Sequence, residues 1–208
     1  MESPRILKNF VALEGIDGSG TTTQLNMIAD KFGAARIPYW TTCEPTVMPS
    51  GKLIRQVLKG DFKVQPESLA RFFEADRYEH INGSEGILAH LKNDEVVISD
   101  RYLFSSLAYQ SVDCGFDTVY ELNRHFPLPE IVVYIEVPAE IGDERAATRE
   151  MREIFEYTEF QKKAIGMYDK AFERYGNSGI EVLRVDGTDP KEKVFENIWS
   201  RLQQLPIK

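Results

Sequence analysis

The sequence predicts an α/β fold in which helices cover both faces of a central parallel sheet. Short runs of β-branched or aromatic residues recur along the chain, and each is followed by a longer segment of helical period. Most of these runs are apolar at consecutive positions, which is typical of strands that are buried on both faces. The length of 208 residues favours one domain, or one domain with an inserted lid.

The strands and helices can be placed along the chain in order. The runs that fit strands are Phe10–Glu14, Ile37–Thr42, Glu95–Ser99, Ile131–Glu136 and Ile180–Val185. The segments of helical period are Gln24–Phe32, Pro49–Leu58, Pro66–Leu91, Leu103–Val112, Thr118–Arg124, Ala139–Arg149, Phe155–Tyr175 and Lys191–Leu205. The sequence has no internal repeat and no Gly/Ser-rich linker, so we expect a single domain over residues 1–208.

Composition narrows the classes of partner. With 25 Lys and Arg against 33 Asp and Glu, the net charge is −8, which argues against nucleic-acid and anionic-membrane partners. Cys43 and Cys114 are too few for a disulfide framework and lack metal-ligand spacing, which favours a reducing cytoplasm. No stretch approaches the roughly 18 apolar residues of a membrane span. A small anionic ligand remains compatible with this charge.

A glycine-rich turn follows the first predicted strand and leads into the first predicted helix. Successive backbone N–H groups and a helix N-terminus can surround a phosphate in that geometry. Gly15 and Gly20 occupy the glycine positions of G-x-x-x-x-G-K-[ST], and Thr22 occupies the hydroxyl position that binds Mg²⁺. Thr21, however, stands where the lysine belongs. The pattern therefore predicts a phosphate-binding loop without its usual charge.

The third predicted strand ends in an acid followed by a base, Asp100 and Arg101. In a parallel sheet this carboxyl end faces the phosphate loop that follows the first strand. A carboxylate there can hold Mg²⁺, and a guanidinium can bind a phosphate through two N–H groups. A surface ion pair is the alternative for Asp100 and Arg101 considered alone.

Four motifs then occur in order along the chain. They are Glu14-Gly-x-Asp-Gly-x-Gly with Thr-Thr-Gln, Glu44-Pro45, Phe73-x-x-x-Arg77, and Asp100-Arg101-Tyr102-x-x-Ser105-x-x-Ala108-Tyr109-Gln110. Together they resemble the thymidylate kinase family from about Phe10 to Trp199. The resemblance implies a three-layer P-loop kinase fold with a five-stranded parallel sheet and a short helical lid. It also implies transfer of a phosphoryl group from ATP-Mg²⁺ to dTMP, a step of dTTP synthesis, by a homodimer.

The resemblance also implies roles for individual residues of the acceptor site. Phe73 would stack on thymine and Arg77 would donate to its carbonyl edge; their spacing of four puts both on one helical face. Tyr109 would crowd the 2′ position of the sugar. Nearby polar contacts would come from Ser105 and Gln110.

The acceptor phosphate and sugar would meet residues from other loops. Asp17 would address the 3′-hydroxyl or the surroundings of the 5′-phosphate, and Glu44 with Pro45 would help to position the phosphate. The family usually has an arginine before this Glu-Pro pair, but here the residue is Cys43. Arg101 would then hold the phosphate, with Arg55 helping from the next helix. Cys43 itself is interpreted as a small buried hydrophobic residue.

The donor side is predicted from the phosphate loop, the metal ligands and the lid. The ATP-binding set is Gly15, Asp17, Gly18, Ser19, Gly20, Thr21, Thr22 and Thr23, and the magnesium set is Thr22, Asp100 and Glu14. The stretch of about 143–156 resembles the family's lid, in which Arg145 and Arg149 remain while Glu153-Ile154 replaces the usual Asp-Arg pair. Arg152 is a neighbour that could substitute. We therefore predict Asp17, Arg101, Arg145, Arg149 and Arg152 as the catalytic residues. The stretch Val185–Pro190 has the position of the family's adenine-side loop.

Two other interpretations stay open at this point. The same fold could phosphorylate another deoxynucleotide or deoxynucleoside. Alternatively, the protein could bind nucleotides without catalysis, because Thr21, Cys43 and Ile154 replace three basic residues. Retention of Gly15, Gly20, Thr22, Asp100 and Arg101 favours an active enzyme.

Overall fold

The fold is built on a five-stranded parallel sheet. The computed structural model describes residues 4–147, 155 and 157–205. The strand order is β2-β3-β1-β4-β5, and every neighbouring pair runs parallel. The strands are β1 (Ile6–Glu14), β2 (Tyr39–Cys43), β3 (Val96–Asp100), β4 (Leu128–Glu136) and β5 (Glu181–Asp186). The predicted five-stranded parallel sheet is confirmed.

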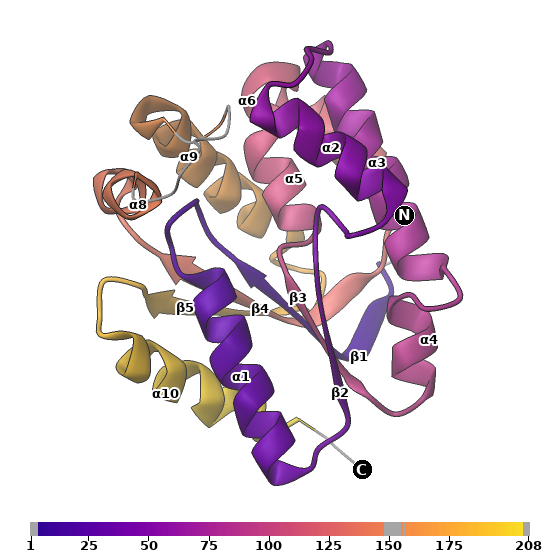
Figure 1. Ribbon diagram of the computed structural model, residues 1–208, viewed down its shortest axis with the longest axis vertical. Coiled ribbons are helices and arrows are strands. Elements are labelled where there is room, and N and C mark those ends of the chain that lie inside the picture. Colours follow the sequence, from indigo (N-terminus) through magenta and orange to yellow (C-terminus); the bar gives the residue numbers. More distant parts are fainter. Residues whose placement is uncertain (1–3, 148–154, 156, 206–208) are drawn as a thin grey trace.

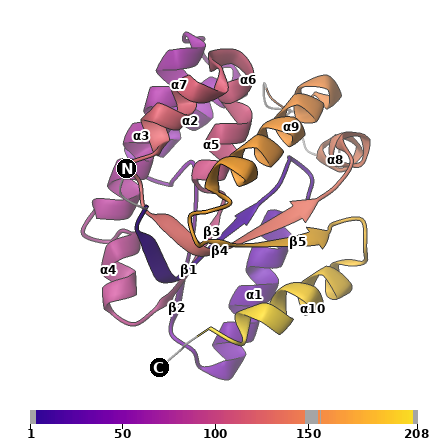
Figure 2. The same ribbon diagram turned by 180° about the vertical axis from the view of Figure 1, so that it is seen from behind.

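Helices cover both faces of this sheet, as predicted. They are α1 (Thr21–Ala35), α2 (Pro49–Lys59), α3 (Pro66–Asn82), α4 (Ile87–Lys92), α5 (Leu103–Tyr109), α6 (Ser111–Cys114), α7 (Phe116–Asn123), α8 (Ala139–Ala146), α9 (Thr158–Tyr175) and α10 (Lys191–Leu202). Figures 1 and 2 show α1 and α10 on one face, and α2, α3, α5 and α9 on the other. Each face has its own apolar core, with Ile28 and Ile198 in one and Phe104 and Tyr168 in the other.

Register places the carboxyl ends of three strands at one edge of the sheet. Leu13 of β1 and Cys43 of β2 both lie opposite Asp100 of β3. The residues that follow β1, β2 and β3 therefore emerge side by side. This edge carries the phosphate loop, the Glu44-Pro45 turn and Arg101.

Two predicted helices are divided in the structure. The segment 66–91 forms α3 and α4, because the chain turns at Gly83 and Gly86. A Cβ at Gly86 would lie 2.6 Å from the carbonyl oxygen of His80, so only glycine fits this close approach. The segment 103–112 is likewise divided, between α5 and α6.

The lid region is described only at its edges. Helix α8 ends at Ala146 and α9 begins at Thr158, three residues after the predicted start at Phe155. Most of the predicted lid, about 143–156, lies outside the described residues, as do Arg149 and Arg152. Among the described helices, none is long and apolar enough to span a membrane.

Candidate active site

The turn between β1 and α1 has the backbone of a phosphate-binding loop. Gly18 and Gly20 adopt φ angles of 79° and 99°, a left-handed region that glycine enters without strain. Gly20 caps α1 without a side-chain hydrogen bond, so the first N–H groups of the helix stay available to an anion. Thr21, in the usual lysine position, is 7% exposed.

This loop packs closely on helix α8. A Cβ at Gly18 would lie 2.3 Å from the carbonyl oxygen of Gly142, and a Cβ at Gly142 would lie 2.6 Å from that of Asp17. Two glycines thus let α8, which begins the lid region, touch the phosphate loop. Gly18 belongs to the predicted ATP-binding set, whereas Gly142 was not predicted.

Thr22 and Asp100 form the part of the predicted magnesium set that fits a metal. The Thr22 hydroxyl donates to Asp100 Oδ2 at 2.5 Å, which brings together a hydroxyl from α1 and a carboxylate from β3. The second oxygen, Oδ1, is buried and has no hydrogen-bond partner within the described part of the chain. A hydroxyl beside an under-coordinated carboxylate suits Mg²⁺, which takes one or two protein ligands and keeps several waters.

Arg101 lies at the centre of the sheet edge. Its Nη1 donates to the carbonyl oxygen of Gly15 at 2.8 Å and to Ser105 Oγ at 3.1 Å, and its Nη2 donates to Asp17 Oδ1 at 2.6 Å. The residue leaves β3 with a φ of 69°, uncommon for a side chain with a Cβ, and this turn aims the guanidinium back at the phosphate loop. Arg101 therefore joins β3 to the phosphate loop through charge-assisted hydrogen bonds.

A cavity of about 910 Å³ opens along this edge and brings most of the predicted site residues together. The predicted residues that line it are Asp17, Gly18, Ser19, Gly20, Thr21, Thr22, Thr23, Glu44, Pro45, Arg55, Phe73, Arg77, Asp100, Arg101, Ser105, Tyr109, Gln110 and Arg145. Its size is sufficient for more than one small ligand. The residues predicted for the donor side and for the acceptor side therefore line one continuous cavity.

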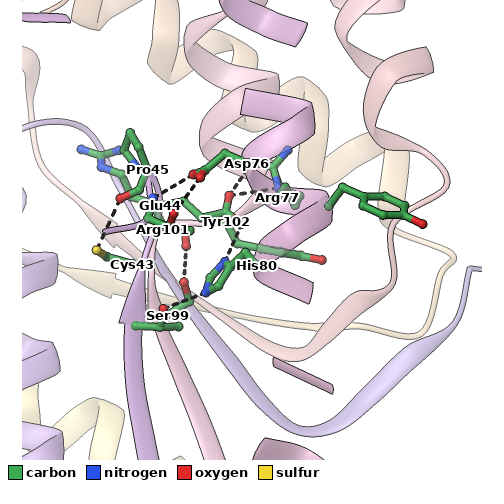
Figure 3. Close-up of polar contacts among 12 residues, drawn as sticks. Cys43, Glu44, Pro45, Asp76, Arg77, His80, Ser99, Arg101 and Tyr102 are labelled. Atoms are coloured by element: carbon green, nitrogen blue, oxygen red, sulfur yellow. Dashed lines mark hydrogen bonds and ion pairs between the residues drawn. The ribbon is translucent and has the colours of Figure 1, made fainter. Parts of the chain in front are cut away.

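A buried carboxylate, Glu44, anchors one wall of the cavity (Figure 3). Glu44 Oε2 accepts from Arg77 Nε at 2.9 Å and Nη2 at 2.6 Å, and Oε1 pairs with His80 Nδ1 at 2.9 Å. Arg77 also donates to Asn123 and to Ser106 Oγ, so four of its five N–H groups are used, and it is 1% exposed. The second N–H on Nη1 has no partner among the described residues. Glu44 thus acts by holding Arg77 on the cavity wall.

Arg55 of α2 fills the space beside Cys43 (Figure 3 shows Cys43 next to Pro45). Its Nη2 donates to the carbonyl oxygen of Pro45 and lies 3.5 Å from the Cys43 sulfur. Burial raises the pKa of the Cys43 thiol, so the thiol stays neutral. Arg55 therefore places a positive charge beside Cys43 on the cavity wall.

Comparison with known proteins agrees with this geometry. A family model described as thymidylate kinase matches residues 13–198. The chain belongs to the thymidylate kinase family. A relative in Treponema pallidum (strain Nichols) that carries the thymidylate kinase name is 41% identical over 202 residues, which are 96% of this chain and 97% of the relative. A protein named "Probable thymidylate kinase" in Methanococcus maripaludis is 42% identical over 94% of this chain and 96% of its own length. A protein of the same name in Methanococcus vannielii is 37% identical over 96% of this chain and 98% of its own length.

Family membership makes the chain a nucleoside-monophosphate kinase, and Arg145 is the one predicted lid arginine that lies among the described residues. Arg145 Nη1 donates to the carbonyl oxygen of Gly187 at 3.0 Å and lies 3.5 Å from that of Gly18. Gly187 belongs to the turn that the thymidylate kinase resemblance places beside adenine, and it also lines the cavity. Arg145 thus spans the phosphate loop and the predicted adenine side.

Glu14 does not fit the magnesium set in which the sequence analysis placed it. Its side chain is fully buried, and both carboxylate oxygens are occupied within the protein. Oε1 accepts from the Tyr102 N–H at 2.9 Å, while Oε2 accepts from Ser105 Oγ at 2.5 Å and Tyr168 OH at 3.0 Å. Burial raises the pKa of Glu14 to about 7. Glu14 is a buried anchor beneath Arg101.

Replacing Glu14 by glutamine should flatten the dependence of stability on pH. The pKa of Glu14 is 4.5 when the side chain is exposed in the unfolded chain and about 7 in the folded protein. Between these two pH values the folded state therefore binds more protons than the unfolded state. Stability from this group is therefore present below about pH 4.5 and lost as the pH rises through about 7, a difference of about 3 kcal/mol. Urea unfolding of parent and Glu14→Gln from pH 5 to 8 checks this. Parallel curves for the two proteins would contradict it.

Three residues that the sequence analysis did not single out complete the site. Asn123 Oδ1 accepts from Arg77, Tyr168 OH donates to Glu14, and Gln161 contacts Asp17, Tyr109 and Phe155. All three belong to helices on the face of the sheet that α3, α5 and α9 cover, and each is at most 1% exposed. Each of them holds another residue of the site in place through a hydrogen bond.

Proposed function

We propose that the protein transfers the γ-phosphoryl group of ATP to dTMP and forms dTDP, a step of dTTP synthesis. The observation that carries the proposal is the shared cavity, which joins the open N-terminus of α1 to the wall formed by Phe73, Arg77 and Tyr109. Phosphoryl transfer depends mainly on holding donor and acceptor in line and on compensating the charge of the transferred group. The cavity provides an anion-binding end and a base-binding end for this purpose.

Each end supplies distinct groups in this proposal. The backbone of residues 18–22 holds the ATP phosphates, and Thr22 with Asp100 holds Mg²⁺, which would neutralise charge on the phosphate oxygens. Arg101 and Arg55 bind the phosphate of dTMP. Asp17 addresses the sugar or its phosphate, and the remaining Arg77 N–H donates to a thymine carbonyl.

An acceptor panel tests this proposal. ADP release is measured with ATP-Mg²⁺ over dTMP, dUMP, dCMP, dGMP and thymidine, and over the ribose analogue of dTMP. dTMP should have the highest kcat/KM, because a site that donates to the base edge rejects analogues more strongly than an apolar slot does. Equal turnover of dCMP or of the ribose analogue would contradict the acceptor assignment. Binding of ATP and dTMP without ADP release would favour the non-catalytic interpretation.

Phe73→Ala should weaken dTMP binding by about 1–3 kcal/mol, the usual contribution of stacking between an aromatic ring and a base. Phe73 is half-buried on α3 and lines the cavity. Its neighbour Phe72 is also half-buried and packs on the same core but is not among the described residues of the cavity. Calorimetric titration of dTMP should therefore show a loss for Phe73→Ala and none for Phe72→Ala. Unchanged affinity in Phe73→Ala would place the base elsewhere.

The same proposal includes features that follow from the family resemblance. We expect Mg²⁺ dependence, a homodimer and a cytoplasmic location, with no nucleic-acid or membrane partner. Light scattering tests the dimer. Loss of turnover with EDTA and its recovery with Mg²⁺ tests the cation.

A further inference from the structure

Four side chains close a ring of hydrogen bonds at the acceptor end of the cavity. Asp17 Oδ1 accepts from Arg101 Nη2 at 2.6 Å, and the same Nη2 donates to Tyr109 OH at 3.4 Å. Tyr109 OH donates to Gln161 Oε1 at 3.3 Å, and Gln161 Nε2 donates to Asp17 Oδ2 at 3.0 Å. The four come from the phosphate loop, the end of β3, α5 and the first turns of α9. Gln161 is the member to which the proposed function gives no role.

The amide of Gln161 has a partner for each of its hydrogen-bonding positions. Besides the two ring contacts, Oε1 accepts from the Asp17 N–H at 3.3 Å and Nε2 donates to the carbonyl oxygen of Phe155 at 2.6 Å. These partners fix the orientation of the amide, because Nε2 must face the carboxylate and the carbonyl. Gln161 therefore ties both the backbone and the carboxylate of Asp17 to α9.

The ring of hydrogen bonds determines how the side chains of Tyr109 and Asp17 face the cavity. Tyr109 OH accepts from Arg101, and its single proton goes to Gln161. Without Gln161 this proton could turn to the nearby Asp17 carboxylate, and Asp17 Oδ2 would lose its amide donor. Gln161 itself is 1% exposed and is not among the described residues that line the cavity. Its effect on a ligand is therefore indirect.

We propose that Gln161 is a positioning residue for recognition of the acceptor sugar, acting through Tyr109 and Asp17. This inference rests on the proposed function, in which those two side chains face the deoxyribose and its phosphate. Tyr109 excludes a 2′-hydroxyl only while its ring and hydroxyl stay in place. Gln161 holds the Tyr109 hydroxyl in place through its hydrogen bond. Removing one member of a buried hydrogen-bond network weakens the contacts of the other members as well.

Steady-state kinetics of Gln161→Met with dTMP and its ribose analogue tests the inference. Methionine has a similar length and makes none of the four hydrogen bonds. We expect KM for dTMP to rise about 10-fold or more, as for loss of a hydrogen bond to a charged group. The ratio of kcat/KM for dTMP to that for the ribose analogue should fall, while KM for ATP stays unchanged. Gln161→Glu should do more, because it sets an oxygen against Asp17 Oδ2.

Three further variants isolate the role of Gln161. Lys162→Met changes the neighbouring exposed residue of α9, and Phe172→Leu loosens the packing of α9 away from the ring. Both should keep the parent's sugar discrimination. The double variant Tyr109→Phe/Gln161→Met should lose less sugar discrimination than the sum of the two single variants, because both changes act through the same hydroxyl.

The results separate this inference from the proposed function. Parent-like KM and sugar discrimination in Gln161→Met would overturn the inference, as would equal loss of discrimination in Phe172→Leu. A parent protein that does not phosphorylate dTMP would overturn the proposed function. Titration of dTMP and its ribose analogue into the unreacted protein would then still decide whether Gln161 sets the preference for deoxyribose.

Discussion

Replacing Arg101 by methionine should lower kcat/KM for dTMP by about 10³-fold or more. An arginine that binds the reacting phosphates contributes about 10³–10⁵ in rate. Arg101, the proposed ligand of the dTMP phosphate, reaches Gly15 and Asp17 of the phosphate loop. Methionine keeps a Cβ, so the backbone strain at φ 69° is the same in both proteins. The difference therefore reports the guanidinium. Coupled measurement of ADP release against dTMP concentration gives the ratio.

Arg184→Met is the matched control for Arg101. Arg184 also holds two carboxylates, with Nη1 at 2.6 Å from Glu136 and Nη2 at 2.8 Å from Asp169, but it lies on the surface of β5. Its loss should leave kcat/KM unchanged, because exposed ion pairs contribute little. If Arg101→Met kept kcat/KM within about 10-fold of the parent, the phosphate charge would be compensated elsewhere.

The sheet could be predicted because its signal is local. Most strand centres are apolar at consecutive positions, and the run from Phe10 to Gly20 contains both a strand and the glycine-rich loop that follows it. Strand lengths depend on pairing instead. β1 begins at Ile6, before the predicted Phe10, because Ile6 and Leu7 pair with Leu128 and Pro129 of β4 across a register shift. No local pattern contains that partner.

Site residues that belong to a loop motif could be predicted from the sequence. The role of a residue could not be predicted where it depends on whether the side chain is buried. Asp100, Arg101 and Thr22 belong to recognisable motifs at strand or helix ends. Glu14 follows the same logic, yet the structure turns it inward onto Tyr102 and Ser105. Its position at the end of β1 alone does not indicate which way the side chain points.

Gln161 was not predicted as a site residue, although the sequence contains a signal for its burial. The buried positions of α9 include Gln161, Ala164, Tyr168 and Tyr175, which recur at helical spacing on one face. A glutamine on that apolar stripe must find hydrogen-bond partners, and a buried polar residue is more informative than an exposed one. The stripe could have identified Gln161 as part of a network, but not its partners on distant segments.

Removing the lid arginines should lower kcat because Thr21 leaves the phosphate loop without a lysine. A lysine there touches the β- and γ-phosphates as a point charge, whereas threonine offers a neutral hydroxyl. Charge that develops on the transferred group then needs another cation. We expect Arg149→Ala to lower kcat by about 10²-fold or more with a modest change in ATP affinity, since an interaction made only in the transition state affects kcat. Arg145→Ala and Arg152→Ala should have smaller effects.

The structure bears on this prediction through Arg145, which already lies against the phosphate loop near Gly18. Restoring the lysine provides the sharpest test. In a Thr21→Lys background, Arg149→Ala should cost less kcat than in the parent, because the new ammonium supplies part of the missing charge, and the two changes should be non-additive. Arg174→Ala, an exposed arginine stacked on Tyr120 at the far end of α9, is the control and should leave kcat unchanged. Unchanged kcat after alanine substitution of Arg145, Arg149 and Arg152 together would assign the compensating charge to another part of the site.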